Sequence, residues 1–276
     1  MLIAIPTYKR HSNGKAIILR SLFQELHDKF PITLFVREEE AEPYRKLIGN
    51  NPWTIEPMPA GTIDGIADTR NYMLEWCLRR GIDKICMVDD DVYFCVRGKI
   101  PGDDVHIRMC DPPDTIGMFS WLEEQLRVGY AHAAVSMREG NNRNPGLGAF
   151  TEATRGIRVV AYNLTMLGGT RFRKEVEGRE DLDMTLQLLR QGHANKVTYH
   201  WANGQHSSQT PGGLSEARTR ESIHSSAEKL AALHPGFVKL RTQNNKSGGL
   251  AGERTEVTVY WRKAHEEGLR ARDQGK

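Results

Sequence analysis

The first 92 residues alternate short apolar runs with stretches of helical periodicity, and this alternation limits the fold more than any other feature of the sequence. The apolar runs cover residues 2–8, 32–36, 54–58 and 84–92. Amphipathic stretches separate them at residues 15–29, 38–48 and 65–80. Strands and helices at this spacing are joined by right-handed crossovers, which build a parallel sheet covered by helices on both faces. The sequence therefore predicts an α/β fold with a mostly parallel central sheet.

The alternation becomes irregular after residue 100. We expect a helix at 114–129, a strand at 131–137, a Gly- and Asn-rich loop at 139–149, a β-rich segment at 156–167 and a helix at 180–192. Residues 242–254 have the composition of a flexible loop. The second part of the chain is therefore predicted to be mixed α+β.

Composition is that of an ordinary globular protein. The 276 residues are 39% hydrophobic and 26% charged, with a net charge of +3, which does not by itself identify a nucleic-acid-binding protein. The four cysteines lack C-x-x-C spacing, so we expect buried free thiols in a reducing compartment. The apolar run at the N-terminus is too short for a signal peptide or a membrane span, which favours a cytoplasmic protein without membrane attachment.

Three consecutive carboxylates, Asp89, Asp90 and Asp91, end the fourth apolar run. Adjacent like charges repel one another, so a divalent cation is a natural partner for them. On an extended strand Asp89 and Asp91 share one face, from which both can bind one hard cation while Asp90 points away. A plain acidic turn or a helix cap is the alternative. Because the chain lacks the G-x-x-x-x-G-K-[ST] pattern, ATP-driven phosphoryl transfer is disfavoured.

Four motifs in order resemble a known family. They are IPTYKR at the N-terminus, DGIADTRN at 64–71, VDDDV at 88–92 and GREDLDMTLQLLRQG at 178–192. Over about residues 1–195 the chain resembles nucleotide-sugar glycosyltransferases of the GT-A fold, and most closely the phage-type TET-associated glycosyltransferases. The resemblance implies a nucleotide-sugar-binding half at 1–98 and an acceptor-binding, catalytic half with a C-terminal extension at 99–276, packed as one GT-A domain. For a phage protein, the compartment would be the host cytoplasm.

The resemblance also assigns roles to single residues. Donor binding falls to Pro6, Thr7, Arg10, Arg37, Arg70, Asp89 and Asp90, and binding of Mn²⁺ or Mg²⁺ falls to Asp89, Asp91 and His206. The donor would be a UDP-sugar. His200 is the alternative to His206 as metal ligand. At position 69 this chain has Thr where the family motif around Arg70 usually has Ala.

Asp181 corresponds to the Asp of an E-D motif, which in inverting members of the family acts as general base toward the acceptor hydroxyl. Asp183 is the reserve candidate for this role. The alternative interpretation is that Glu180, Asp181 and Asp183 only stabilise the first turn of a helix.

The resemblance further implies that the acceptor is 5-hydroxymethylcytosine in DNA. Arg and Lys recur from 138 to 179 and from 218 to 254, where they could contact phosphates, and Asn141, Asn142 and Asn144 could contact base edges. Two other hypotheses stay open at this stage. The enzyme could glycosylate a glycan, a lipid or a protein, or the chain could be a non-catalytic nucleotide- or DNA-binding protein.

Overall fold

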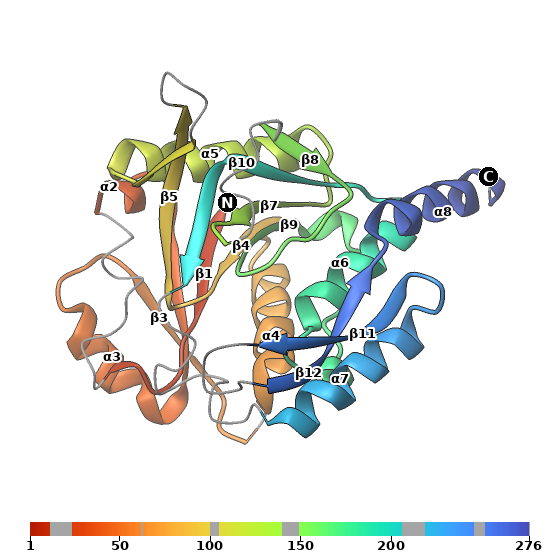
Figure 1. Cartoon of the computed structure of the whole chain (residues 1–276). Helices are drawn as coiled ribbons and strands as arrows, with labels where there is room; N and C mark the ends of the chain where they lie inside the picture. The colour runs from red at the N-terminus through yellow and green to blue at the C-terminus, as the bar shows by residue number, and fades with distance from the viewer. Residues whose placement is uncertain are drawn as a thin grey trace.

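The protein is known from a computed structural model, which describes residues 1–11, 24–61, 63–99, 105–139, 149–205, 219–245 and 252–275. Within these residues, ten strands form one sheet in the order β3-β2-β1-β4-β9-β7-β10-β5-β6, with β8 paired to β10 (Figure 1). The predicted α/β fold is confirmed.

The first four strands are parallel, as the sequence predicts. They are β1 (Leu2–Pro6), β2 (Ile32–Arg37), β3 (Thr54–Met58) and β4 (Lys84–Val88). Along β4, Cys86 and Val88 pack into one hydrophobic cluster while Ile85 and Met87 pack into another. Since consecutive side chains of a strand point to opposite faces, the sheet is buried on both sides here, which explains the uninterrupted apolar runs.

The other strands make the second half mixed, also as predicted. They are β5 (Val92–Lys99), β6 (Val105–Met109), β7 (His132–Met137), β8 (Phe150–Glu152), β9 (Val159–Asn163) and β10 (Asn195–Gln205). Only β7 and β10 pair in parallel among these strands, and β9 runs antiparallel to both β4 and β7. The segment predicted as β-rich at 156–167 is shorter, because β9 ends at Asn163 and a 3₁₀ turn (Leu164–Met166) follows.

Helices cover the sheet. They are α2 (Gln24–His27), α3 (Ala41–Ile48), α4 (Gly65–Arg79), α5 (Pro112–Arg127) and α6 (Glu180–Arg190). Helix α5 begins sharply, since the side chain of Asp111 accepts a hydrogen bond from the Asp114 amide and the Asp114 side chain accepts one from the Asp111 amide. The helix predicted at 15–29 falls largely outside the described residues.

The C-terminal part forms a separate layer beside α6. It contains α7 (Arg220–Leu233), a hairpin of β11 (Val238–Asn245) and β12 (Gly252–Val259), and α8 (Trp261–Gln274). The prediction of a loop over 242–254 is wrong at both ends, because Thr242 pairs with Thr255 and Asn245 with Gly252 in the hairpin. Most side chains at these positions are polar, so the sequence does not indicate strands, which are stabilised here by packing of one face only.

Two smaller predictions concern cysteines and membranes. Cys77, Cys86 and Cys95 are buried free thiols, and Cys110 is partly buried. Within the described ranges, no helix combines the length and the apolar character that a membrane span requires.

Candidate active site

The three consecutive aspartates lie in the connection between β4 and β5, at the carboxyl end of β4. The predicted strand over 84–92 is wrong in its last part, because β4 ends at Val88 and β5 begins at Val92. The strand geometry expected for Asp89 and Asp91 therefore does not apply. Asp90 is only 8% exposed and turns toward the loop after β1, rather than pointing away from the site.

The loop after β1 neutralises two of the aspartates. Arg10 lies with its Nε 3.2 Å from Asp90 Oδ1 and its Nη2 3.2 Å from Asp91 Oδ2. Thr7 donates a hydrogen bond to Asp90 Oδ2 (2.7 Å), and the Tyr44 hydroxyl lies 2.7 Å from Thr7 Oγ1. The predicted donor-binding residues Thr7, Arg10 and Asp90 are thus brought together by the parallel pairing of β1 with β4.

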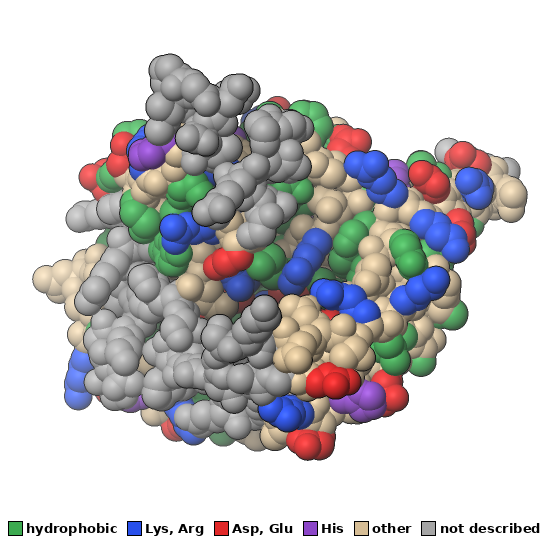
Figure 2. All heavy atoms as spheres, in the orientation of Figure 1, with side chains coloured by type: hydrophobic (Ala, Val, Ile, Leu, Met, Phe, Trp, Pro, Cys, Tyr) green, Lys and Arg blue, Asp and Glu red, His purple; other side chains and the backbone are tan. Residues whose placement is uncertain are grey.

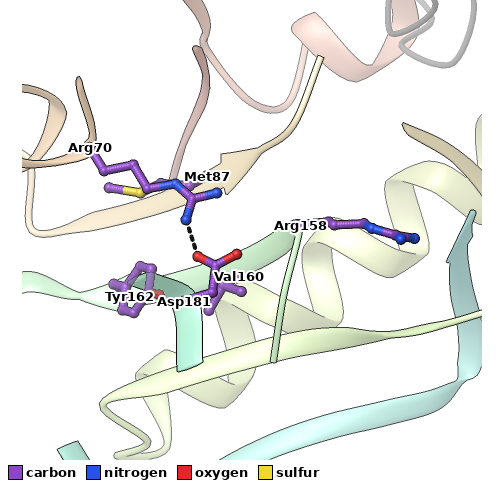
Figure 3. A pocket seen from close by; sticks show the side chains of 6 residues that line it. All are labelled: Arg70, Met87, Arg158, Val160, Tyr162 and Asp181. Atoms are coloured by element: carbon purple, nitrogen blue, oxygen red, sulfur yellow. Dashed lines mark hydrogen bonds and ion pairs between the residues drawn. The ribbon is translucent and has the colours of Figure 1, made fainter. Parts of the chain in front are cut away.

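Arg70 on α4 joins the third aspartate to the acidic start of α6. Its Nη2 lies 3.0 Å from Asp89 Oδ1 and its Nη1 lies 2.9 Å from Glu180 Oε1. Nη1 also pairs with Asp181 Oδ1, the ion pair drawn in Figure 3. A planar guanidinium presents several donors in a fixed arrangement, so one buried arginine can hold three carboxylates from distant parts of the chain. The structure therefore places Asp89 and Asp181 beside one another, around Arg70.

Arg158, the residue before β9, is a part of this site that the sequence motifs miss. Its backbone has φ +65°, which is unusual for a residue other than glycine. Its carbonyl oxygen accepts a hydrogen bond from the Asp89 amide at 2.9 Å, and a backbone hydrogen bond from Arg158 reaches the Asp181 carboxylate. The side chain extends away from Asp181 in Figure 3 and pairs with Glu139. Strained backbone of this kind occurs most often at functional sites.

Burial changes the acid strength of these groups. It raises the pKa of Asp89 to about 6, against the opposing effect of Arg70, and the pKa of Asp90 to about 7, against that of Arg10. It also raises the pKa of Asp181 to about 6, although Arg70 and the backbone of Arg158 favour the charged form. A carboxylate with a pKa near 6 remains mostly ionised at neutral pH and is a stronger base than an ordinary aspartate.

Asp183, the reserve candidate for the base, is fully engaged elsewhere. Its side chain has no exposed surface, and its Oδ1 lies 2.7 Å from His234 Nε2 and 3.2 Å from Arg173 Nη1. Gln187 donates to its other oxygen at 2.7 Å. Arg190 donates to His234 Nδ1, so the histidine proton lies on Nε2 and points at Asp183. These contacts leave no carboxylate surface for an acceptor hydroxyl.

The remaining predicted residues lie at different distances from this centre. Pro6 ends β1 next to Thr7. The Arg37 guanidinium donates to the Ile63 carbonyl and lies 5.5 Å from the centroid of the Tyr8 ring, so it borders the loop after β1. His206 lies outside the described residues. His200 is exposed and lies before the segment from Trp201 to Gln205, which pairs regularly with β5 and has a rise of about 13 Å. It is therefore too far along β10 to replace His206, the neighbour of Gln205, as a ligand.

The metal assignment rests on two aspartates in the described structure. No group of three or more His, Cys, Asp or Glu side chains could hold a metal ion in the part of the chain that is described. Asp91 Oδ2 accepts from Gln205 Nε2 at 2.7 Å, whereas Asp91 Oδ1 is buried and lacks a hydrogen-bond partner among the described residues. A buried carboxylate oxygen in this condition is compatible with a cation, so Asp91 fits the predicted role.

A shallow pocket lies beside Arg70 and Asp181, and its empty space of about 160 Å³ includes open solvent. The lining residues, all drawn in Figure 3, are Arg70, Met87, Arg158, Val160, Tyr162 and Asp181. Because part of this space is open solvent, the hollow does not by itself enclose a nucleotide sugar.

Comparison with known proteins decides the family. Residues 1–213, more than three quarters of the chain, match the TET-Associated Glycosyltransferase family. The chain belongs to this family. The resemblance of its four motifs to TET-associated glycosyltransferases is confirmed. No curated protein matches the sequence significantly.

One of three similar solved structures shares the fold at low sequence identity. A mannosyltransferase from Pyrobaculum calidifontis, in complex with GDP-mannose and Mn²⁺, is 13% identical with a TM-score of 0.56, and the match covers 85% of this chain and 64% of that one. The chain thus spans less than two thirds of that protein. A mycobacterial protein (11% identity, TM-score 0.49, covering 93% and 83%) and a mannose-1-phosphate geranyltransferase from Thermus thermophilus (10%, 0.47, covering 100% and 99%) are more distant. The first likeness shows that the two chains share a fold.

Proposed function

We propose that this TET-associated glycosyltransferase transfers a sugar from a UDP-sugar to the hydroxyl of 5-hydroxymethylcytosine in DNA. The reaction depends on Mn²⁺ or Mg²⁺ and inverts the anomeric carbon. Asp181 is the general base, and the first-strand loop with Asp89 and Asp90 binds the donor.

One observation carries the proposal, namely that Arg70 holds Asp89 and Asp181 around a single guanidinium. Asp89 comes from the donor side of the site, at the end of β4, and Asp181 comes from α6. A transferase must bring a donor diphosphate and an acceptor hydroxyl to opposite sides of one sugar carbon. Because Arg70 pairs with both carboxylates, it fixes the distance between Asp89, which would bind the donor, and Asp181, which would bind the acceptor hydroxyl.

In the proposed step, the hydroxyl oxygen of the acceptor attacks the anomeric carbon and forms the new C–O bond. The bond between the sugar and the diphosphate breaks, and the nucleoside diphosphate leaves with its electron pair. Asp181 takes the hydroxyl proton, for which its raised basicity is suited.

Asp89 and Asp91 are the described residues that would hold the divalent ion, with His206 as the third candidate. When bound, such an ion supplies neutralisation of charge on the leaving diphosphate. Arg10, which already lies against Asp90 and Asp91, adds positive charge at the same end of β4.

Mass spectrometry of the acceptor tests the proposal. Duplex DNA containing 5-hydroxymethylcytosine is incubated with the protein, Mn²⁺ and a panel of nucleotide sugars, and the nucleosides are then weighed. We expect a gain of one hexose or related unit with a UDP-sugar, abolished by chelation and by Asp91→Ala. A gain on glycan or peptide acceptors but never on DNA would replace the proposed acceptor, and DNA binding without transfer from any donor would overturn the proposal.

A further inference from the structure

The hairpin of β11 and β12 carries basic side chains on the face that contacts the start of α6, the helix of Asp181. Residues 214–276, beyond the family match, contain twelve Lys and Arg against eight Asp and Glu, a net charge of +4. Because the whole chain carries +3, the matched residues 1–213 carry −1. The basic excess of this protein therefore belongs to its C-terminal extension.

The two faces of the hairpin differ in what they contact. Val257 and Val259 pack with Leu230 of α7 in a hydrophobic cluster, and Thr255 Oγ1 lies 2.8 Å from His224 Nδ1 of α7. These positions alternate with Arg254 and Glu256, which share the other face. One face of the hairpin thus packs against α7, and the opposite face points away from α7.

The opposite face contacts Arg179, the residue just before α6, which carries the proposed base Asp181. Arg179, next to Glu180 in sequence, donates from Nη1 to Glu256 Oε2 (3.2 Å) and from Nη2 to the Thr255 carbonyl (3.1 Å). Arg179 is only 8% exposed, so this is a buried connection between the hairpin and the first turn of α6. Arg254 pairs with the other oxygen of Glu256 at 2.9 Å.

Lys239 and Arg241 extend this face along β11. Arg241 stands opposite Glu256 in the hairpin register, and Lys239 lies two residues away on the same side. Both side chains are exposed, and within the described residues neither lies within ion-pair distance of an acidic group. Figure 2 shows Lys and Arg side chains around a hollow at the centre of this face of the molecule, beside the region where Figure 1 places β11.

The positive charge continues toward the pocket. Arg155 lies within electrostatic range of Arg158, Arg179 and Glu256, and it precedes the strand that lines the pocket. Glu256 pairs with both Arg179 and Arg254, so Lys239 and Arg241 contribute most of the positive charge that is left on this surface to attract an anion. A row of basic residues that begins on the hairpin and ends at the pocket fits a chain of phosphates better than one phosphate group.

We propose that the face of the β11–β12 hairpin formed by Lys239, Arg241 and Arg254 binds the phosphodiester backbone of the DNA acceptor and guides it to the pocket. This inference rests on the proposed function, because it takes the acceptor to be DNA. It adds that the grip on the backbone comes from the C-terminal extension.

The double variant Lys239→Ser/Arg241→Ser tests this inference. Its binding to a duplex is measured by fluorescence anisotropy between 0.05 and 0.2 M salt, roughly the range over which phosphate contacts are lost. The matched control, Arg79→Ser/Arg127→Ser, removes the same charge from exposed residues at the carboxyl ends of α4 and α5. These helix ends lead into the amino ends of β4 and β7, whereas the site lies at the carboxyl end of β4.

We expect the Kd of the hairpin variant to rise at least tenfold near 0.1 M salt and the slope of log K against log salt to fall by about 2 in magnitude, one unit for each lost phosphate contact. The control should stay within about twofold of the native protein by the same reasoning. Equal losses in both variants, or none in the hairpin variant, would overturn the inference. Native protein that binds DNA but transfers no sugar would instead overturn the proposed function and leave the hairpin result standing.

Discussion

Arg70 places one positive charge among three carboxylates, Asp89, Glu180 and Asp181. Although burial opposes the charged form of the arginine, the three acids together raise its pKa. Removing the charge would leave buried carboxylates that repel one another, which is the costly way to break a buried ion pair.

We therefore predict that Arg70→Met lowers the free energy of unfolding by about 3–5 kcal/mol at pH 7.5. The exposed Arg79 on the same helix supplies the control, since Arg79→Met should change stability by no more than about 0.5 kcal/mol. Chemical denaturation of both variants measures the difference. Equal stability of the Arg70 variant and the native protein would show that the carboxylates do not need this guanidinium.

A separate prediction concerns Arg158, whose left-handed backbone conformation places its hydrogen bonds to Asp89 and Asp181. Arg158→Gly keeps access to this conformation, whereas Arg158→Val opposes it by roughly 1–2 kcal/mol. We expect glycine to preserve kcat and valine to lower it at least about tenfold, the effect of about 1.4 kcal/mol on the barrier. Both variants lack the guanidinium, so similar losses in the two would assign the role to the side chain instead.

At the scale of elements, β7 buries a titratable group in the middle of the sheet. Neither ring nitrogen of His132 has a hydrogen-bond partner among the described residues, and the ring stacks on Tyr162. Burial, with a smaller effect of His193, lowers its pKa to about 3. The unfolded chain therefore takes up this proton at a higher pH than the folded protein does.

The sign of the pH effect follows from this difference. His132 contributes fully to stability above its unfolded pKa of about 6.5 and loses the contribution as pH falls toward 3, with a slope of up to about 1.4 kcal/mol per pH unit. We predict that His132→Leu flattens this part of the stability profile, measured by denaturation from pH 7.5 to 4.5. A profile of His132→Leu parallel to the native one would be contrary to this account.

The elements also show which features can be predicted from sequence. Strands β1 to β4 are recognisable because both of their faces are buried, so the apolar runs are continuous. The hairpin is not, since polar residues occupy one face of each strand and most of β11 is exposed. Strand β10 is interrupted by an irregularity between Thr198 and Ala202, which disturbs the alternation from which a strand is predicted.

The site was predictable to the extent that position after a strand indicates function. Asp89 to Asp91 follow β4, and that placement alone pointed to them. Their neutralisation by Arg10 and Arg70 was not predictable, because it depends on contacts between residues 19 to 81 positions apart. The left-handed conformation of Arg158 has no signal in the sequence, since neither glycine nor asparagine stands there.

At the scale of the whole molecule, one sheet carries the proposed donor side and the proposed acceptor side of the site. Strand β4 ends at the aspartates, and its neighbour β9 begins just after Arg158, whose backbone contacts both Asp89 and Asp181. The C-terminal extension then fastens to the start of α6 through Arg179. Residues between positions 7 and 181 therefore meet at the carboxyl end of β4, with Asp181 as the group that would take the proton, and the extension contacts the residue before Glu180.

Single-turnover kinetics of Asp181→Asn, with saturating donor and hydroxymethylated DNA, test this central claim most directly. Asparagine preserves the size of the side chain but cannot accept the proton, so the rate of transfer should fall by about 10²–10⁴-fold. Donor affinity should stay within about threefold of the native value, a change of less than 1 kcal/mol, and the exposed Glu75→Gln should retain the native rate. A transfer rate for Asp181→Asn close to that of the native protein would contradict the account.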